Sequence, residues 1–175
     1  MAILGPMDVL RSVDEALGVA IGLLLGAPRP DVAWQERRTP PHPAWVSPPL
    51  SADGILLIRA TRYRLEDTTL SRNLAFVDLD RLDPDLTGRL ETGTLHLGQL
   101  FATQQIEKSG FEFGTRDDAE QDLVALLSDE GESDPEPFVW RRYVAEVGGR
   151  RSVLVVETLP VRAWQRMLRA ARRSA

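Results

Sequence analysis

Three absences limit what this 175-residue chain can be. Cysteine does not occur, which excludes disulfide bonds and thiolate chemistry. Histidine occurs only at His42 and His96, far apart and without carboxylates at ligand spacing, so no metal site is expected. The longest apolar run, residues 16–27, is too short to span a bilayer and follows acidic rather than basic residues. The sequence therefore predicts a cytoplasmic protein with no membrane partner.

Charge is distributed unevenly along the chain. The net charge is −5, yet residues 117–136 hold nine acidic and no basic residues, so the remainder carries about +4 by subtraction. We interpret residues 117–137 as an acidic, solvated insertion. A second charged segment, residues 162–173, predicts a short basic helix. Because no recognisable nucleic-acid reader motif accompanies it, nucleic acid is not an expected partner.

Periodicity divides residues 1–175 into the helices and strands of one domain. Helical spacing predicts an N-terminal helix over residues 8–25, and five prolines make residues 39–51 an irregular connector, which Trp45 and Val46 are expected to hold across the core. The predicted strand regions are an edge strand at 31–38, hairpins at 55–79 and 138–159, and a strand at 106–116, with short helices near 80–90, 95–104 and 118–127. This pattern favours an α+β fold with an antiparallel sheet.

Two charged residues occupy strand positions where apolar residues are expected. Glu157 shares a strand face with Val155, and Arg59 shares one with Leu57. Burying an ionised side chain in such a place is costly unless a partner meets it. Each residue therefore marks either a structural ion pair or a ligand site, and the planar guanidinium of Arg59 suits a carboxylate.

The two predicted hairpins resemble each other. Residues 58–63 (Ile-Arg-Ala-Thr-Arg-Tyr) are similar to residues 139–143 (Val-Trp-Arg-Arg-Tyr), and residues 73–79 are similar to residues 153–159. Such similarity indicates a sheet built from a loosely duplicated unit.

Four segments occur in a characteristic order: Thr-Leu-His-Leu-Gly-Gln-Leu-Phe at 94–101, Phe-Glu-Phe-Gly at 111–114, Arg-Arg-Tyr at 141–143 and Val-Glu-Thr-Leu-Pro at 156–160. Taken together, they resemble the chorismate pyruvate-lyase family. The first hairpin also falls at the family's spacing, so the resemblance covers about residues 55–160. It implies a six-stranded antiparallel sheet with helices packed over it and an internal ligand cavity. It further implies an enzyme, a lyase without metal or organic cofactor that eliminates pyruvate from chorismate to leave 4-hydroxybenzoate.

The resemblance assigns catalytic roles to the two unusual charges. Arg59 matches the family arginine that grips the product carboxylate, and Glu157 matches the glutamate near the aromatic hydroxyl. In this mechanism Arg59 would hold the ring carboxylate, while Glu157, as a buried acid, would protonate the departing ether oxygen.

The resemblance also places substrate-binding residues. Leu97 matches the leucine that lines the pocket in the Leu-Gly motif, which Gly98 completes. Tyr63 and Arg142 are expected to reach the enolpyruvyl carboxylate.

The chain departs from the family at three places. Residues 17–23 are wholly apolar, His96 replaces a proline, and the hairpin turn at 66–69 lacks glycine and proline. Two alternatives to chorismate cleavage therefore stay open. One is a related cyclase, isomerase or eliminase in specialised biosynthesis, acting on a larger carboxylate. The other is a non-catalytic protein that binds an aromatic carboxylate or another small ligand.

The same fold serves as the effector domain of some bacterial transcription regulators. Their DNA-binding winged helix is not expected here, because no N-terminal domain precedes residue 8. The expected partner is a small carboxylate, and the expected assembly is a monomer or a weak homodimer.

Overall fold

The structure, a computed structural model, describes residues 30–47, 49–65, 68–127, 137–163 and 165–166. The predicted helix at residues 8–25 lies outside these residues. So do most of the predicted basic helix at 162–173 and residues 128–136 of the acidic insertion. None of the helices in the described part of the chain has the length and apolar character needed to cross a bilayer.

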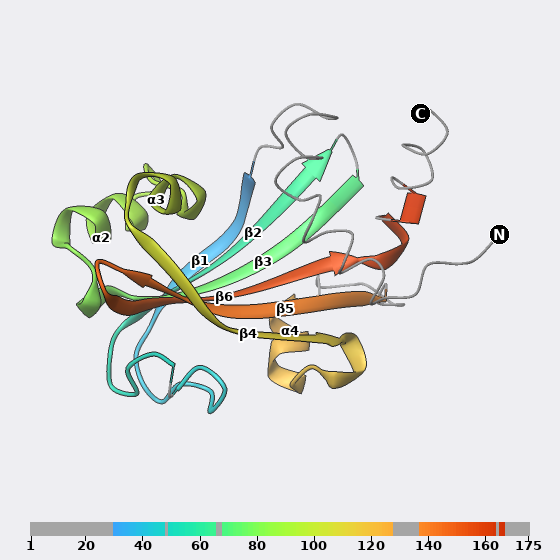
Figure 1. Ribbon diagram of the computed structural model, residues 1–175, viewed down its shortest axis with the longest axis horizontal. Coiled ribbons are helices and arrows are strands. Elements are labelled where there is room, and N and C mark those ends of the chain that lie inside the picture. Colours follow the sequence, from blue (N-terminus) through green and yellow to red (C-terminus); the bar gives the residue numbers. More distant parts are fainter. Residues whose placement is uncertain (1–29, 48, 66–67, 128–136, 164, 167–175) are drawn as a thin grey trace.

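Six strands form one antiparallel sheet in the order β1-β2-β3-β6-β5-β4 (Figure 1). The strands are β1 (Pro30–Arg38), β2 (Leu56–Leu65), β3 (Thr68–Asp78), β4 (Ile106–Thr115), β5 (Phe138–Val147) and β6 (Arg150–Pro160). The helices are α2 (Pro84–Glu91), α3 (Leu97–Thr103) and α4 (Gln121–Leu127), with 3-10 turns η1 (Leu79–Arg81) and η2 (Arg116–Asp118). The predicted α+β class, both hairpins and the edge strand are confirmed.

The sheet is covered on both faces. Helices α2 and α3 pack on one face, where Leu90, Leu95 and Leu100 join a cluster of buried residues with Val153 and Val155. The other face is covered by the proline-rich connector and by α4, which lies on the far side of the strands from α2 and α3 (Figure 1). A strand buried on both faces needs apolar residues at successive positions, which explains the apolar runs at residues 56–58 of β2 and 153–156 of β6.

The proline-rich connector is held to the core as predicted. Val46 is fully buried, and the ring of Trp45 meets the ring of Phe76 edge-on with centroids 5.1 Å apart. The histidine of this segment, His42, hydrogen-bonds through Nε2 to the Gly54 carbonyl at 2.8 Å. The connector therefore closes the face opposite to α2 and α3.

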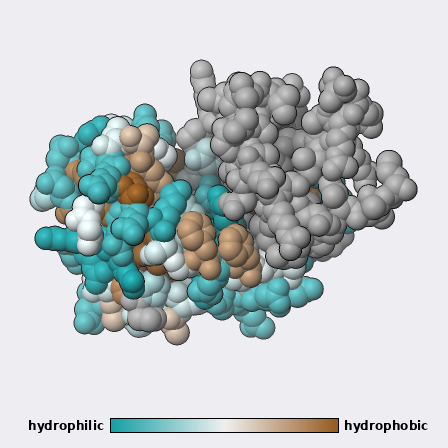
Figure 2. All heavy atoms as spheres, in the orientation of Figure 1, coloured by the Kyte–Doolittle hydropathy of each residue, from teal (hydrophilic) through white to brown (hydrophobic). Residues whose placement is uncertain are grey.

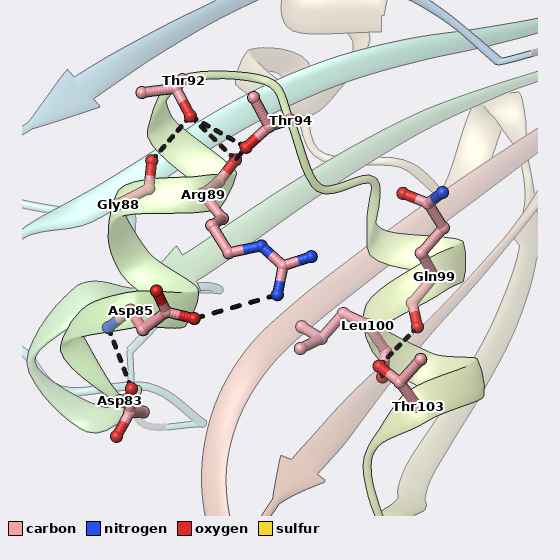
Figure 3. Close-up of polar contacts among 9 residues, drawn as sticks. All are labelled: Asp83, Asp85, Gly88, Arg89, Thr92, Thr94, Gln99, Leu100 and Thr103. Atoms are coloured by element: carbon pink, nitrogen blue, oxygen red, sulfur yellow. Dashed lines mark hydrogen bonds and ion pairs between the residues drawn. The ribbon is translucent and has the colours of Figure 1, made fainter.

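Hydroxyl groups shape the turn from α2 to α3 (Figure 3). Asp83 caps α2 by accepting a hydrogen bond from the Asp85 amide at 2.9 Å. At the other end, Thr92 Oγ1 donates to the Gly88 carbonyl at 2.9 Å, and Thr94 Oγ1 donates to the Arg89 carbonyl at 3.2 Å. These bonds fix the loop whose backbone passes over β2.

The sheet consists of two equivalent three-stranded halves. In the hairpin β2–β3, Leu65 pairs with Thr68 and Arg64 with Thr69, and the register then shifts by one residue at Leu70. In the hairpin β5–β6, Val147 pairs with Arg150, and Ser152 is extra at the same step. Each residue of the first hairpin thus corresponds to the residue 82 positions later (147 minus 65). The predicted duplication is therefore present in the backbone.

A pseudo-twofold axis passes through the centre of the sheet. The β3–β6 register pairs Leu74 with Val156, and these two residues correspond to each other in the two halves. Sequence similarity had matched Asn73 with Val153, whereas the register matches Asn73 with Val155. The two matches differ by two residues, which leaves the assignment of residues to faces unchanged.

Gly114 is required by the close approach of Trp140. A Cβ at residue 114 would lie 2.7 Å from the indole Cε2 and Cζ2 atoms. We expect Gly114→Ala to lower the free energy of unfolding by about 1–3 kcal/mol, because the indole must move. Gly88 in α2 is the control, because a Cβ there meets no heavy atom within 4 Å. Gly88→Ala should raise that free energy by about 0.5–1 kcal/mol. Urea denaturation measures both, and equal effects would contradict the packing.

Candidate ligand-binding site

A cavity of about 190 Å³ lies between the sheet and α3. Side chains from β2, β3, β4, β5 and β6 line it, together with the first turns of α3. The lining residues are Arg59, Thr61, Tyr63, Asn73, Ala75, His96, Leu97, Gly98, Phe101, Lys108, Tyr143, Val155 and Glu157. Five of the six residues predicted for the site are therefore brought together, and Arg142 is not.

The strand register arranges the cavity floor in two rows. Residues that pair across antiparallel strands point to the same face of the sheet. Arg59 and Glu157 therefore share one face, separated by β3 and by one row. The first row is Thr61, Asn73, Glu157 and Arg141, and the second is Arg59, Ala75, Val155 and Tyr143.

The guanidinium of Arg59 joins the sheet to the end of α2. Arg59 is only 2% exposed. Its Nη1 donates to the Leu95 carbonyl at 3.1 Å, its Nη2 donates to the Leu90 carbonyl, and its Nε donates to Gln35 Oε1 at 3.1 Å. Leu90 belongs to the last turn of α2, where the helix dipole favours a positive charge.

Arg59 keeps hydrogen-bonding capacity for a ligand. Arginine has five N–H donors, and Arg59 uses three of them on neutral acceptors. Among the residues that the structure describes, no carboxylate forms an ion pair with it. Burial lowers the pKa of the Arg59 guanidinium, but arginine remains protonated in proteins. The cavity wall therefore holds a buried positive charge with two unused N–H groups.

Glu157 is partnered by Arg141, a residue that the sequence analysis did not select. Arg141 Nε donates to Glu157 Oε2, and the two side chains are 13% and 16% exposed. The hydroxyl of Tyr143 donates to Glu157 Oε1 at 3.4 Å. Glu157 thus lines the cavity and also forms an ion pair, which is one of the two alternatives expected for this residue.

Arg142 lies on the opposite face of the sheet, contrary to the prediction. It pairs there with Glu112 at 2.8 Å and with Glu120 at 3.1 Å. The reason is the extra residue Ser152. An uninterrupted hairpin that pairs Val147 with Arg150 would place Arg142 opposite Val155 on the cavity face, but the bulge shifts its partner to Val156.

Lys108 was also missed, although it is the only lysine of the chain. It reaches the cavity from β4, with Nζ 4.8 Å from the ring centroid of Tyr143 and 5.4 Å from that of Phe101. Such positions favour a cation, which the aromatic faces attract. Its place in the site follows from β4 lying beside β5, and sequence periodicity does not give that order.

Aromatic side chains continue from the cavity onto the surface. Phe111 stacks on Tyr143 with centroids 5.2 Å apart, and Phe113 lies 6.3 Å from Phe111. Phe111 and Phe113 are 45% and 47% exposed. The side chains visible in Figure 2 outside the grey residues are mostly hydrophilic, with apolar ones in small groups.

The two tyrosines of the chain, Tyr63 and Tyr143, both line the cavity. Burial raises the pKa of each hydroxyl, and the negative charge of Glu157 raises it further. Both residues therefore present neutral hydroxyl groups. That of Tyr143 already donates to Glu157, and that of Tyr63 can donate a hydrogen bond to a ligand.

These raised pKa values predict a loss of stability in alkali. An unfolded tyrosine ionises near pH 10, whereas the folded hydroxyls stay protonated. The stability linked to them is therefore complete below about pH 10 and falls as the pH rises towards the folded pKa. Tyrosinate absorbance at about pH 10 should be weaker in the native protein than in urea, where it is half developed. Tyr143→Phe should lessen the alkaline loss, and normal ionisation in the native protein would refute the burial of these hydroxyls.

Arg59 is expected to be structural as well as ligand-facing. Arg59→Met removes donors from the buried Leu90 and Leu95 carbonyls and should lower the free energy of unfolding by about 2–5 kcal/mol. Arg37→Met is the matched control, because Arg37 on β1 also contacts α2, through Glu91 at 3.1 Å, but its side chain is 59% exposed. That change should cost about 0.5 kcal/mol or less. Urea denaturation that gave similar losses would disprove the anchoring role.

No family model matches the sequence, and no curated protein matches it. Solved structures do match in shape. A GntR-family transcriptional regulator from Enterococcus faecalis V583 aligns with a TM-score of 0.53 at 9% identity, over 77% of this chain and 95% of its own. A protein described as a transcriptional regulator from Streptomyces coelicolor gives 0.52 at 16% identity, over 75% and 85%. The ligand-binding domain of a GntR-family regulator from Bordetella bronchiseptica gives 0.50 at 13%, over 75% and 85%.

These neighbours contradict the predicted lyase. They are named as transcriptional regulators or as a regulator's ligand-binding domain, whereas the resemblance had implied an enzyme. The order of segments therefore identified the architecture and not the activity. The chain has the chorismate lyase-like fold, a single domain with a six-stranded antiparallel sheet that it shares with GntR-family regulators.

Proposed function

We propose that this chain is a non-enzymatic ligand-binding domain of the regulatory kind, whose cavity takes a small organic anion. The observation that carries the proposal is the buried guanidinium of Arg59, which lines the cavity and whose hydrogen bonds all go to neutral acceptors. A guanidinium without a counter-ion is a suitable partner for a carboxylate. A structural role alone would be served by the three bonds that Arg59 already makes.

The rest of the cavity supports an aromatic ligand that carries a hydroxyl group. Phe101 and Tyr143 offer apolar ring surface, and Glu157 offers an acceptor for a hydroxyl proton on the same face as Arg59. A volume of about 190 Å³ is small, since pockets for drug-sized ligands hold roughly 300–1,000 Å³. These properties suit a molecule of the size of 4-hydroxybenzoate.

Lys108 extends the positive character of the site to its rim. It lies on the exposed part of the cavity wall, so water and salt screen its charge more than that of Arg59. We assign it a role in attracting the anion, which affects association and salt dependence more than the final affinity.

Calorimetric titration with 4-hydroxybenzoate and the uncharged 4-hydroxybenzamide tests the proposal. We expect the carboxylate to bind about tenfold tighter or more, because the amide cannot form charge-assisted bonds with Arg59. Arg59→Lys should weaken carboxylate binding by about tenfold, because an ammonium group lacks the planar fork. Equal affinities for the acid and the amide would overturn the proposal.

The single lysine allows the bound ligand to be located. An amine-acylating reagent can modify only Lys108 and the terminal amino group, so that the latter serves as an internal control. The ligand should slow the acylation of Lys108 and leave the terminal amine unchanged, as peptide mass spectrometry would report. Protection of neither group by saturating ligand would place the ligand outside this cavity.

A further inference from the structure

We infer that Glu157 is an internal counter-ion that restricts the cavity to ligands with a single anionic group. The inference rests on the proposed function and concerns its specificity. It follows from the pseudo-twofold symmetry of the sheet together with the charges at equivalent positions.

The cavity face contains two equivalent arginines. Arg59 on β2 and Arg141 on β5 correspond through the 82-residue offset between the hairpins (141 minus 59). Their cross-strand neighbours correspond as well: Arg59 pairs with Ala75, and Arg141 pairs with Glu157. One half of the sheet therefore places a carboxylate beside its arginine, where the other half has a methyl group.

This difference determines which of the two arginines keeps an uncompensated positive charge that can attract a ligand. The acceptors of Arg59 are two backbone carbonyls and the Gln35 amide, all neutral, so that its charge remains uncompensated. The Nε group of Arg141 meets the carboxylate of Glu157, which cancels its charge. Glu157 thus occupies, at one half, the position that a ligand carboxylate would take at the other.

This charge pairing determines which chemical group the cavity accepts at the end of the ligand opposite its carboxylate. A ligand whose acid group lies at Arg59 presents its opposite end to Glu157 and Tyr143. A hydroxyl group there can donate to Glu157, whereas a second carboxylate finds Arg141 already paired with Glu157 and gains no cation to offset its desolvation. The cavity should therefore accept hydroxyl-bearing monoanions and reject dianions of the same shape.

Terephthalate and 4-hydroxybenzoate are suitable probes, because they differ in the group opposite the shared carboxylate. For the wild-type chain, calorimetric titration should show that 4-hydroxybenzoate binds about tenfold tighter or more. Glu157→Gln should shift this ratio towards terephthalate by about tenfold or more, because Arg141 then lacks its carboxylate partner and can attract the second acid group. The double variant Arg141→Gln/Glu157→Gln removes both charges and should shift the ratio back towards the wild-type value.

Gln35→Glu provides the converse test. It offers Arg59 a carboxylate of nearly the same shape as the amide that already accepts from Nε, and so imitates the pair of Glu157 with Arg141. The affinity for both probes should fall by about tenfold or more. A melting curve checks that this exposed position leaves the fold intact.

The outcomes separate the two proposals. If the wild-type chain binds neither probe, the proposed function fails and this inference fails with it. If the wild-type chain binds 4-hydroxybenzoate but Glu157→Gln leaves the ratio of the two affinities unchanged in a folded protein, only the counter-ion role of Glu157 is overturned. A shifted ratio that the double variant reverses supports the inference.

Discussion

The hydrogen bonds from Arg59 to the Leu90 and Leu95 carbonyls are the constraint on which the site depends. Helices as short as α2 and α3 gain little from their own backbone bonds and rely on tertiary contacts. The guanidinium holds two carbonyls over β2: that of Leu90 at the end of α2 and that of Leu95 just before α3. The cavity exists because α3 is held over the sheet at that distance, with Leu97 above the floor.

A second constraint is the pair of bulges that the two hairpins share. A strand alternates its side chains between faces, so that one extra residue reverses the assignment beyond it. Leu70 and Ser152 are extra at equivalent steps, and each sets the face on which the rest of its hairpin presents its charges. With the bulge at Ser152, Arg141 pairs with Glu157 and faces the cavity, while Arg142 pairs with Val156 and faces the other side.

The sequence predicted most of the architecture and part of the site. Period-two patterns located the strands, and the unusual positions of Arg59 and Glu157 marked both as site candidates, which the register brings to one face. The exchange of Arg141 for Arg142 was not predictable from alternation, because Ser152 has no local feature that marks it as a bulge. The position of Lys108 in the site depends on which strands are neighbours, and the pairing of Glu157 with Arg141 depends on the strand register. Neither property is contained in a pattern of apolar residues.

The double role of Arg59 gives the fold a physical means of responding to a ligand. A ligand changes an equilibrium only if it binds two states of the protein with different free energies. The side chain that would hold the ligand carboxylate also holds the α2 end and the Leu95 loop, through bonds to neutral carbonyls. A ligand held by Arg59, as proposed, would therefore contact the same guanidinium that docks the end of α2 and the Leu95 carbonyl on β2.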